Sequence, residues 1–201
     1  MGSTRRIVAF DNVSADGYFS GAEGQLDWVI SDAELQRSIM SGDTGIDTAL
    51  FGRRTYDQFE SFWPRALADP GTAPNPHGPG RSPESHAFAV ALNEMTKVVY
   101  SRTRKDVTWH NSRLVRDFDP KAVEAMKKEP GKGIIVFGSG SIAAALTRHR
   151  LIDEYHFVVS PVLLGNGRSL LSGLEKKTKL HLQEAKGFSS GVVLLRYALS
   201  D

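Results

Sequence analysis

The chain has 201 residues, of which 40% are hydrophobic and 24% are charged, and its formal net charge is +2. A chain of this length can bury a substantial core, and so small a net charge is not typical of nucleic-acid-binding proteins. The absence of cysteine excludes disulfides, thiolate metal sites and a cysteine nucleophile, and it fits a reducing cytoplasm. No apolar run approaches the roughly 18 residues that span a membrane. We therefore expect a cytoplasmic protein with one domain over residues 1–201 that binds neither nucleic acid nor membrane.

The N-terminal segment predicts a strand followed by a loop. The apolar run at residues 6–13 has the composition of a strand, and the Ser-Ala-Asp-Gly sequence at 14–17 ends it with a turn. Gly21 and Gly24 extend this turn, so the segment is expected to be a mobile loop.

Helix and strand signals alternate in the next segment. Ser31 and Glu34 have the spacing of a capping box and predict the start of a helix. Residues 48–51 form a short apolar strand pattern, and aromatic residues at helical spacing predict a helix over 53–62.

The middle of the chain contains a stretch rich in proline and glycine at residues 64–87, which predicts a long surface loop. Strands are expected at 96–100 and, as a short element, at 107–109. Asp119 followed by proline predicts a capped helix start, and this helix is expected to end near residue 130.

The C-terminal part predicts a strand at 133–137, an alanine-rich helix, and strands at 154–160, 179–185 and 192–198. Strands and helices alternate until the end, where strands predominate. This order predicts an α/β fold with three layers, a mostly parallel central sheet and an antiparallel C-terminal hairpin.

The junction between the strand at 133–137 and the following helix carries the most specific functional signal. Its sequence is Gly138-Ser139-Gly140-Ser141, which we call the glycine turn. Glycines allow backbone N–H groups to approach a ligand closely, and a helix start adds unpaired donors and partial positive charge. The turn therefore predicts binding of a phosphate or pyrophosphate, although such a junction can also serve packing alone.

Two further strand ends carry similar groups. Gly52-Arg53-Arg54-Thr55 follows one predicted strand, and Ser101-Arg102 follows another. In an open α/β sheet, ligands bind beyond the carboxyl ends of the strands. Because a guanidinium can bind a terminal phosphate with two hydrogen bonds, this set favours NADPH over NADH.

Taken together, these segments make the chain resemble the dihydrofolate reductase-like family. The resemblance is strongest to the branch that contains the reductase domain of riboflavin biosynthesis and its uncharacterised paralogues. The motifs that carry it are Ser14-Ala15-Asp16-Gly17, Phe51-Gly52-Arg53-Arg54-Thr55-Tyr56, Val98-Val99-Tyr100-Ser101, Phe137-Gly138-Ser139-Gly140, Asp153-Glu154, and Ser160 to Gly167. One departure is the first strand, which reads Val8-Ala9-Phe10-Asp11 where the riboflavin branch has Thr-x-Lys, so a role in riboflavin biosynthesis is not implied.

The resemblance implies an NADPH site and a mobile loop that closes over it. Phosphates would lie on the 52–55 segment, the 2′-phosphate near Ser101 and Arg102, and the pyrophosphate and nicotinamide side on the glycine turn. The first strand and its turn would flank the nicotinamide. The implied cofactor-binding residues are Ala9, Asp16, Gly17, Gly52, Arg53, Arg54, Thr55, Ser101, Arg102, Phe137, Gly138, Ser139, Gly140, Ser141 and Ile142.

The resemblance also implies a carboxylate near the start of the first long helix. Counting onward from the 14–17 turn indicates Asp32, whereas alignment on Trp28 indicates Asp27. Either carboxylate would orient an amino-pyrimidine and assist proton delivery. The two alternatives stay open at the level of sequence.

The function implied is hydride transfer from NADPH to a small heterocyclic substrate, pterin- or pyrimidine-like. The alternative is a nucleotide-binding protein of the same fold without turnover. A Rossmann dehydrogenase matches less well, because no acidic residue follows the glycine turn at the required distance of about 20 residues. The six histidines lack metal-ligand spacing, so we expect no metal, and the C-terminal strands suggest a homodimer.

Overall fold

The computed structural model describes residues 4–41, 45–68, 83–174 and 176–200. Its helices are α1 (Ala33–Ser41), α2 (Arg53–Ala68), α3 (Pro83–Glu94), α4 (Pro120–Lys128) and α5 (Gly140–Arg148). Its strands are β1 (Ile7–Ser14), β2 (Tyr18–Ser20), β3 (Ile46–Gly52), β4 (Thr96–Tyr100), β5 (Ser112–Val115), β6 (Gly133–Phe137), β7 (Glu154–Ser160), β8 (Arg168–Ser169), β9 (Leu180–Gly187) and β10 (Val193–Leu199).

Eight strands form one sheet in the order β5-β4-β3-β6-β1-β7-β10-β9. The strands from β5 to β7 run parallel, whereas β10 is antiparallel to both β7 and β9. The predicted parallel sheet with an antiparallel C-terminal hairpin is therefore confirmed. The parallel arrangement brings the carboxyl ends of β1, β3, β4 and β6 to one edge of the sheet.

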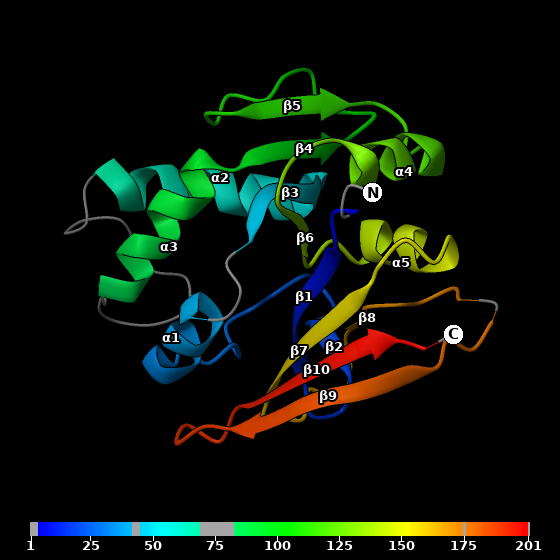
Figure 1. Cartoon of the computed structure of the whole chain (residues 1–201). Coiled ribbons are helices and arrows are strands. Elements are labelled where there is room, and N and C mark those ends of the chain that lie inside the picture. The colour runs from blue at the N-terminus through cyan, green and yellow to red at the C-terminus, as the bar shows by residue number, and fades with distance from the viewer. Residues whose placement is uncertain (1–3, 42–44, 69–82, 175, 201) are drawn as a thin grey trace.

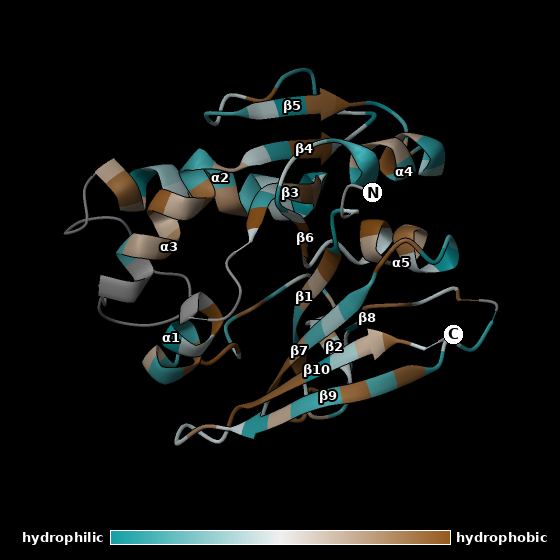
Figure 2. Cartoon of the chain, viewed as in Figure 1, coloured by the Kyte–Doolittle hydropathy of each residue, from teal (hydrophilic) through white to brown (hydrophobic). Residues whose placement is uncertain are grey.

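Helices cover both faces of this sheet, which gives three layers (Figure 1). The helices α4 and α5 pack on one face, in a core that includes Ile7, Val123 and Leu146. The helices α2 and α3 pack on the other face, where Phe51 and Leu92 are buried. The strands differ in hydropathy between the centre and the edge of the sheet. The middle strands are mostly hydrophobic, whereas hydrophilic and hydrophobic residues alternate along the edge strand β9 (Figure 2).

Local sequence signals explain several element boundaries. The Asp119 side chain accepts a hydrogen bond of 2.9 Å from the Lys121 N–H, and Pro120 occupies the first helical position of α4. The predicted start of this helix is therefore confirmed. At α1, by contrast, the N-cap is Asp32 and not Ser31, because the Asp32 carboxylate accepts from the Leu35 N–H at 2.8 Å.

The predicted loop at 64–87 is wrong at both of its ends. Helix α2 continues through Pro64 to Ala68, and α3 begins at Pro83. Packing accounts for the difference, because the Trp63 ring lies 5.0 Å from the ring of Phe88 on α3, and Ala66 is buried. These contacts offset the hydrogen bond that a proline removes from a helix. The remaining part of the prediction, residues 69–82, lies outside the described residues.

Two further expectations need correction. The fifth strand lies at 112–115, beside β4, and not at 107–109. The segment before it instead places Trp109 in the core, where the Lys97 ammonium lies 4.5 Å from its ring centroid. In the expected mobile loop, residues 18–20 form β2, which pairs with β8.

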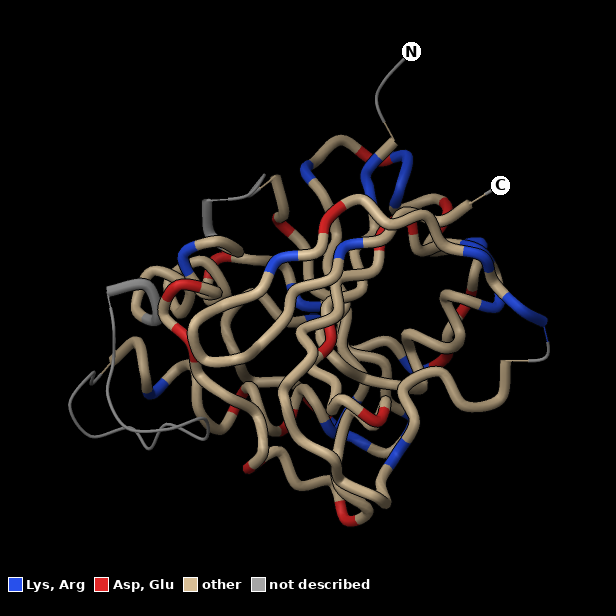
Figure 3. The backbone as a smooth tube through the Cα atoms, turned by 90° about the horizontal axis from the view of Figure 1, so that it is seen from below, with Lys and Arg blue, Asp and Glu red and all other residues tan. Residues whose placement is uncertain are grey.

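The charged residues are distributed around the molecule, with acidic and basic side chains interspersed (Figure 3). Within the described residues, none of the helices has the length and hydrophobicity that a membrane span requires.

Candidate active site

A cavity of about 1410 Å³ lies at the edge of the sheet where the parallel strands end. Ligand pockets for a single small molecule usually measure about 300–1,000 Å³, so this cavity has room for two ligands side by side. The predicted cofactor residues that line it are Gly52, Arg53, Arg54, Thr55, Ser101, Arg102, Phe137, Gly138, Ser139, Gly140 and Ser141. Three distant segments of the chain are thus brought together as the sequence predicts.

Other predicted residues do not line this cavity. Ala9 and Ile142 are buried in the core on the α5 side of the sheet. Gly17 and Asp16 do not line the cavity either. Asp16 instead joins the turn after β1 to residues 164 and 165 through hydrogen bonds. The Asp16 carboxylate accepts hydrogen bonds from Ser14 and from the backbone N–H groups of residues 164 and 165, and these bonds lower its pKa.

The glycine turn is held by hydrogen bonds to two other segments. Gly138 and Ser139 have positive φ angles of 50° and 56°, a conformation that is strained for serine. The Ser139 hydroxyl accepts from the Gly52 N–H at 2.8 Å, and the Ser139 N–H donates to the Thr55 hydroxyl at 3.1 Å. The Gly138 N–H donates to the Phe10 carbonyl at 3.2 Å. These side chains therefore fix the shape of the turn.

At the start of α5, two backbone donors of the glycine turn have no acceptor within the helix and are available to a ligand. Its Ile142 and Ala143 N–H groups donate to the Ser139 carbonyl, whereas Gly140 and Ser141 occupy the first helical positions, whose N–H groups have no acceptor within a helix. A Cβ atom on Gly140 would lie 3.0 Å from the Phe19 ring, so a side chain does not fit. The turn can therefore bind an anion through its backbone.

Arginine side chains add positive charge beside the turn. Arg53 forms an ion pair with Asp57 at 3.0 Å, and Arg102 forms one with Asp117 at 2.6 Å. The Arg102 side chain is 81% exposed, and ion pairs at such positions contribute little to stability. Its guanidinium can therefore turn to a phosphate at small cost. Arg104, in contrast, is held by Asp57 and Glu60 and serves the structure.

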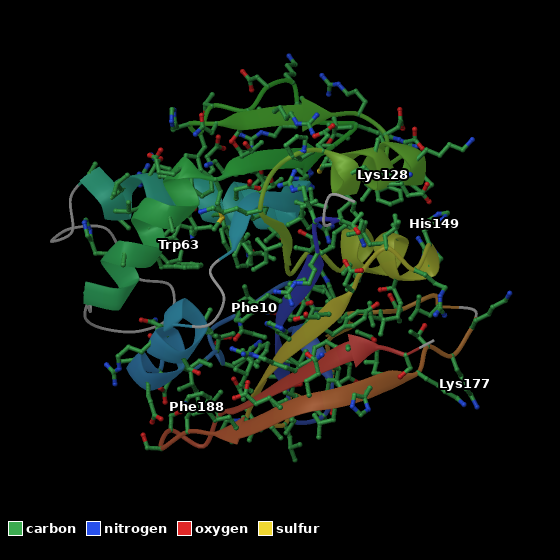
Figure 4. All side chains as sticks on the ribbon, in the orientation of Figure 1. Phe10, Trp63, Lys128, His149, Lys177 and Phe188 are labelled. Carbon is green, nitrogen blue, oxygen red and sulfur yellow. The ribbon has the colours of Figure 1, made fainter. Side chains whose placement is uncertain are left out.

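Aromatic side chains line another part of the cavity. Their rings pack against one another. The ring centroid of Trp63 lies 4.9 Å from that of Phe62 and 5.0 Å from that of Phe88, and the centroid of Phe137 lies 5.3 Å from that of Phe59. Figure 4 shows that Phe10 and Trp63 lie between the sheet and the helices α1–α3. We call this set the aromatic wall; it consists of Phe10, Phe59, Phe62, Trp63, Phe88 and Phe137.

Of the two predicted carboxylates, Asp32 lines the cavity and Asp27 does not. Asp27 is exposed in the loop before α1. Burial alone would raise the pKa of Asp32, but hydrogen bonds from Ser190 and from the Leu35 and Glu34 backbone outweigh this, and its pKa lies below the ordinary value. Asp32 is therefore ionised at neutral pH, and it can accept hydrogen bonds from a ligand.

The family and its known structures fit this geometry. The family described as the RibD C-terminal domain matches residues 5–194. The chain belongs to this family. Two proteins of Bacillus subtilis (strain 168) cover nearly its whole length: the uncharacterized protein YyaP is 29% identical over 96% of this chain and 94% of its own, and the uncharacterized protein YwjB is 26% identical over 94% and 96%.

Solved structures show that this RibD C-terminal domain protein has the dihydrofolate reductase-like fold. A putative riboflavin biosynthesis protein from Shewanella sp. PV-4 superposes with a TM-score of 0.67 at 20% identity, over 98% of this chain and 99% of the other. A dihydrofolate reductase from Enterococcus faecalis, complexed with NADP(H), superposes with a TM-score of 0.60 at 11% identity, over 98% and 97%. The fold predicted from the sequence is confirmed.

The structure of this family member also reveals a carboxylate that sequence reasoning missed. Asp11 on β1 lines the cavity and is 2% exposed, and neither of its oxygen atoms has a hydrogen-bond partner among the described residues. Burial raises the pKa of this carboxyl well above its ordinary value. The signal was present in the sequence, because strand alternation places Asp11 on the same face as the apolar residues Ile7 and Ala9.

The aromatic wall was missed for a different reason. The helical spacing predicts Phe59 and Trp63 on one helix face, but the predicted loop at 64–87 separates them from Phe88, and only the packing of α2 against α3 brings these rings together. Among the described residues of this RibD C-terminal domain protein, no group of three or more His, Asp or Glu side chains is placed to hold a metal ion.

Proposed function

We propose that the protein is an NADPH-dependent reductase that transfers hydride to a small planar heterocycle, pterin- or pyrimidine-like. One observation carries this proposal: a single cavity joins an anion-binding turn to an aromatic wall. A dinucleotide phosphate needs the first part, and a flat heterocycle packs on the second.

The cofactor half of the cavity fits NADPH in its chemistry. The first N–H groups of α5 are free to bind a pyrophosphate, while Arg53, Arg54 and Arg102 supply charge for further phosphates, including the 2′-phosphate. The Enterococcus faecalis structure of the same fold is named as a complex with NADP(H), which supports this assignment. When bound, the cofactor supplies the hydride, and the protein supplies position and exclusion of water.

The substrate half fits an uncharged aromatic ring. Aromatic side chains favour stacked and edge-to-face contacts with flat ligands, and the ionised Asp32 at the cavity wall can accept hydrogen bonds from amino or ring N–H groups. A structure from Thermotoga maritima, of which this chain spans 57%, is named a diaminohydroxyphosphoribosylaminopyrimidine deaminase and 5-amino-6-(5-phosphoribosylamino)uracil reductase. Its name supports a pyrimidine-like substrate for the present protein.

The loop around Gly24 and Leu26 also lines the cavity. We propose that it closes over the bound ligands, since exclusion of water protects a hydride transfer from side reactions. The Arg168 side chain donates to the Ala22 carbonyl at 3.2 Å, which ties this loop to the short strand β8.

The decisive experiment is a titration of the purified protein with NADPH and with NADH, followed by nicotinamide fluorescence. We expect tight NADPH binding, a clear preference over NADH, and oxidation of NADPH when dihydropterin or pyrimidine acceptors are added. Binding without oxidation by any acceptor would favour the non-catalytic nucleotide-binding alternative. Failure to bind either nucleotide would refute the proposal.

We also propose that the protein forms a homodimer through its C-terminal strands. Leu163, after β7, is 76% exposed and Leu182 on the edge strand β9 is 47% exposed, and a paired edge would cover Leu182. Sedimentation equilibrium tests this, since a mass near 22.0 kDa would show a monomer.

A further inference from the structure

Asn12 presents an amide group to the cavity from the central strand β1. The residue is half-buried and lines the cavity together with Phe10, which stands two positions earlier on the same strand. Side chains two positions apart on a strand lie on the same face of the sheet, and Phe10 lies between the sheet and the helices α1–α3 (Figure 4). Asn12 therefore projects towards the aromatic wall, whereas Asp11 projects from the opposite face, into the core under α5.

The strand register places Asn12 beyond the end of β6. The last pair between β1 and β6 joins Phe10 to Phe137, and the chain then leaves the sheet in the glycine turn. On its other side Asn12 pairs with Val158 of β7, which is buried in one cluster with Leu35 of α1. The Asn12 side chain therefore lies at the level where the glycine turn leaves the sheet, next to the cluster on which α1 packs.

The amide group of Asn12 lacks a partner within the described part of the protein. It makes no hydrogen bond there, and unlike the Asp11 carboxyl oxygens its atoms are not sealed from solvent. Other polar side chains of the cavity are already in use, since Ser139 and Thr55 hold the glycine turn. A half-buried amide has lost part of its hydration, and without hydrogen bonds it gains nothing in return. A ligand in the cavity can supply the bonds that the protein does not.

An amide group complements a particular arrangement of ligand atoms. Its Oδ1 atom accepts hydrogen bonds and its Nδ2 atom donates them, so Asn12 can bind a donor and an acceptor that stand side by side on a ring. The ionised Asp32 carboxylate, in the same cavity, only accepts. The two side chains therefore suit a heterocycle that has amino or N–H groups towards Asp32 and a separate donor–acceptor edge towards Asn12.

We propose that Asn12 determines substrate specificity by binding an adjacent donor and acceptor on the edge of an uncharged nitrogen heterocycle. The inference rests on the proposed reductase function and deepens it, because it specifies which ring edge the site recognises. A cyclic amide and an amidine edge both fit, since the amide of Asn12 can turn about its last torsion angle. Flat carbonyl compounds without ring nitrogen do not fit. Asn12 moves neither hydride nor proton in this role; it positions the ring against the aromatic wall.

The recognition is tested by calorimetry with two fused-ring probes, on protein saturated with NADP+. Pterin carries amino, oxo and N–H groups on its pyrimidine ring, whereas quinoxaline has two fused six-membered rings without these groups. Asn12→Leu removes the donor and the acceptor at similar size, so its affinity for pterin should fall at least about 10-fold. Quinoxaline should bind wild type and variant equally weakly. Asn166→Leu is the matched control, because Asn166 is exposed and does not line the cavity; it should keep wild-type affinities.

Thermal unfolding without ligand separates recognition from a structural role. Since the amide has no hydrogen bond to lose, Asn12→Leu should melt no lower than wild type. A lower melting temperature, an equal loss of affinity for both probes, or wild type that does not bind pterin overturns the proposal. Loss of NADPH affinity in Asn12→Leu with unchanged pterin affinity also overturns it, because Asn12 then binds the carboxamide of the cofactor. Wild type that binds pterin through Asn12 but does not bind NADPH overturns the reductase function and leaves the role of Asn12 in place.

Discussion

The Thr55 hydroxyl makes one hydrogen bond to the glycine turn, and a substitution of similar shape can remove this bond alone. It accepts a hydrogen bond of 3.1 Å from the N–H of Ser139, a residue that is 7% exposed. Thr55→Val keeps the shape of the side chain and removes the acceptor. Thr55→Ser keeps the hydroxyl and removes a methyl group, so it is the matched control.

The expected magnitude follows from the burial of the donor. A buried N–H that loses its partner costs about 1–3 kcal/mol, which lowers the melting temperature of a chain of this size by roughly 2–12 °C. NADPH affinity should fall as well, because Gly140 and Ser141 present their N–H groups correctly only while the turn keeps its shape.

Both quantities are measured on the same samples, by thermal unfolding and by NADPH titration. We expect Thr55→Val to be less stable and to bind NADPH more weakly than Thr55→Ser. If the two variants unfold at the same temperature and bind NADPH equally, the hydroxyl does not hold the turn, and this reasoning is refuted.

Three other substitutions test separate parts of the structure. Arg102→Ala should weaken NADPH by about 1–3 kcal/mol and leave NADH unchanged, with Arg113→Ala outside the cavity as control; equal losses for the two cofactors would exclude a 2′-phosphate contact. Asp32→Ala should cost about 0.5–2 kcal/mol of stability through loss of the N-cap, measured by urea denaturation, while Asp32→Asn should retain most of it and weaken only binding of amino-heterocycles. Lys97→Met should cost about 3 kcal/mol in the same assay, because the buried ammonium donates to three carbonyls near the end of α3; a loss below about 1 kcal/mol would show that these carbonyls do not need it.

The sequence predicts which strand ends meet at the glycine turn, because the signals at these ends are local. Glycine, hydroxyl and arginine groups at the ends of strands act through the backbone and through charge, and the parallel sheet brings such ends together. The sequence does not show which of these hydroxyls already form hydrogen bonds within the protein. The hydroxyls of Ser139, Thr55 and Ser101 all accept hydrogen bonds from backbone N–H groups, and only tertiary structure reveals this.

The aromatic wall is less predictable, because it depends on contacts between distant segments. Pro64 is a helix breaker by local rules, yet packing of Trp63 against Phe88 carries α2 past it. Asp11 is similar, since only the structure shows that its buried carboxyl group has no hydrogen-bond partner among the described residues. The continuation of α2 past Pro64 and the environment of Asp11 both depend on residues that are distant in the sequence and become neighbours only on folding.

Helix α2 contains Arg53 and Arg54 in its first turn and Phe59, Phe62 and Trp63 further along. At 1.5 Å per residue its 16 residues form a rod of about 24 Å. Because a helix moves as one body, a displacement that adjusts one end to its ligand also moves the other. A displacement of α2 on binding in one half of the cavity would therefore change the affinity of the other half, and thermodynamic reciprocity would make that effect equal in both directions.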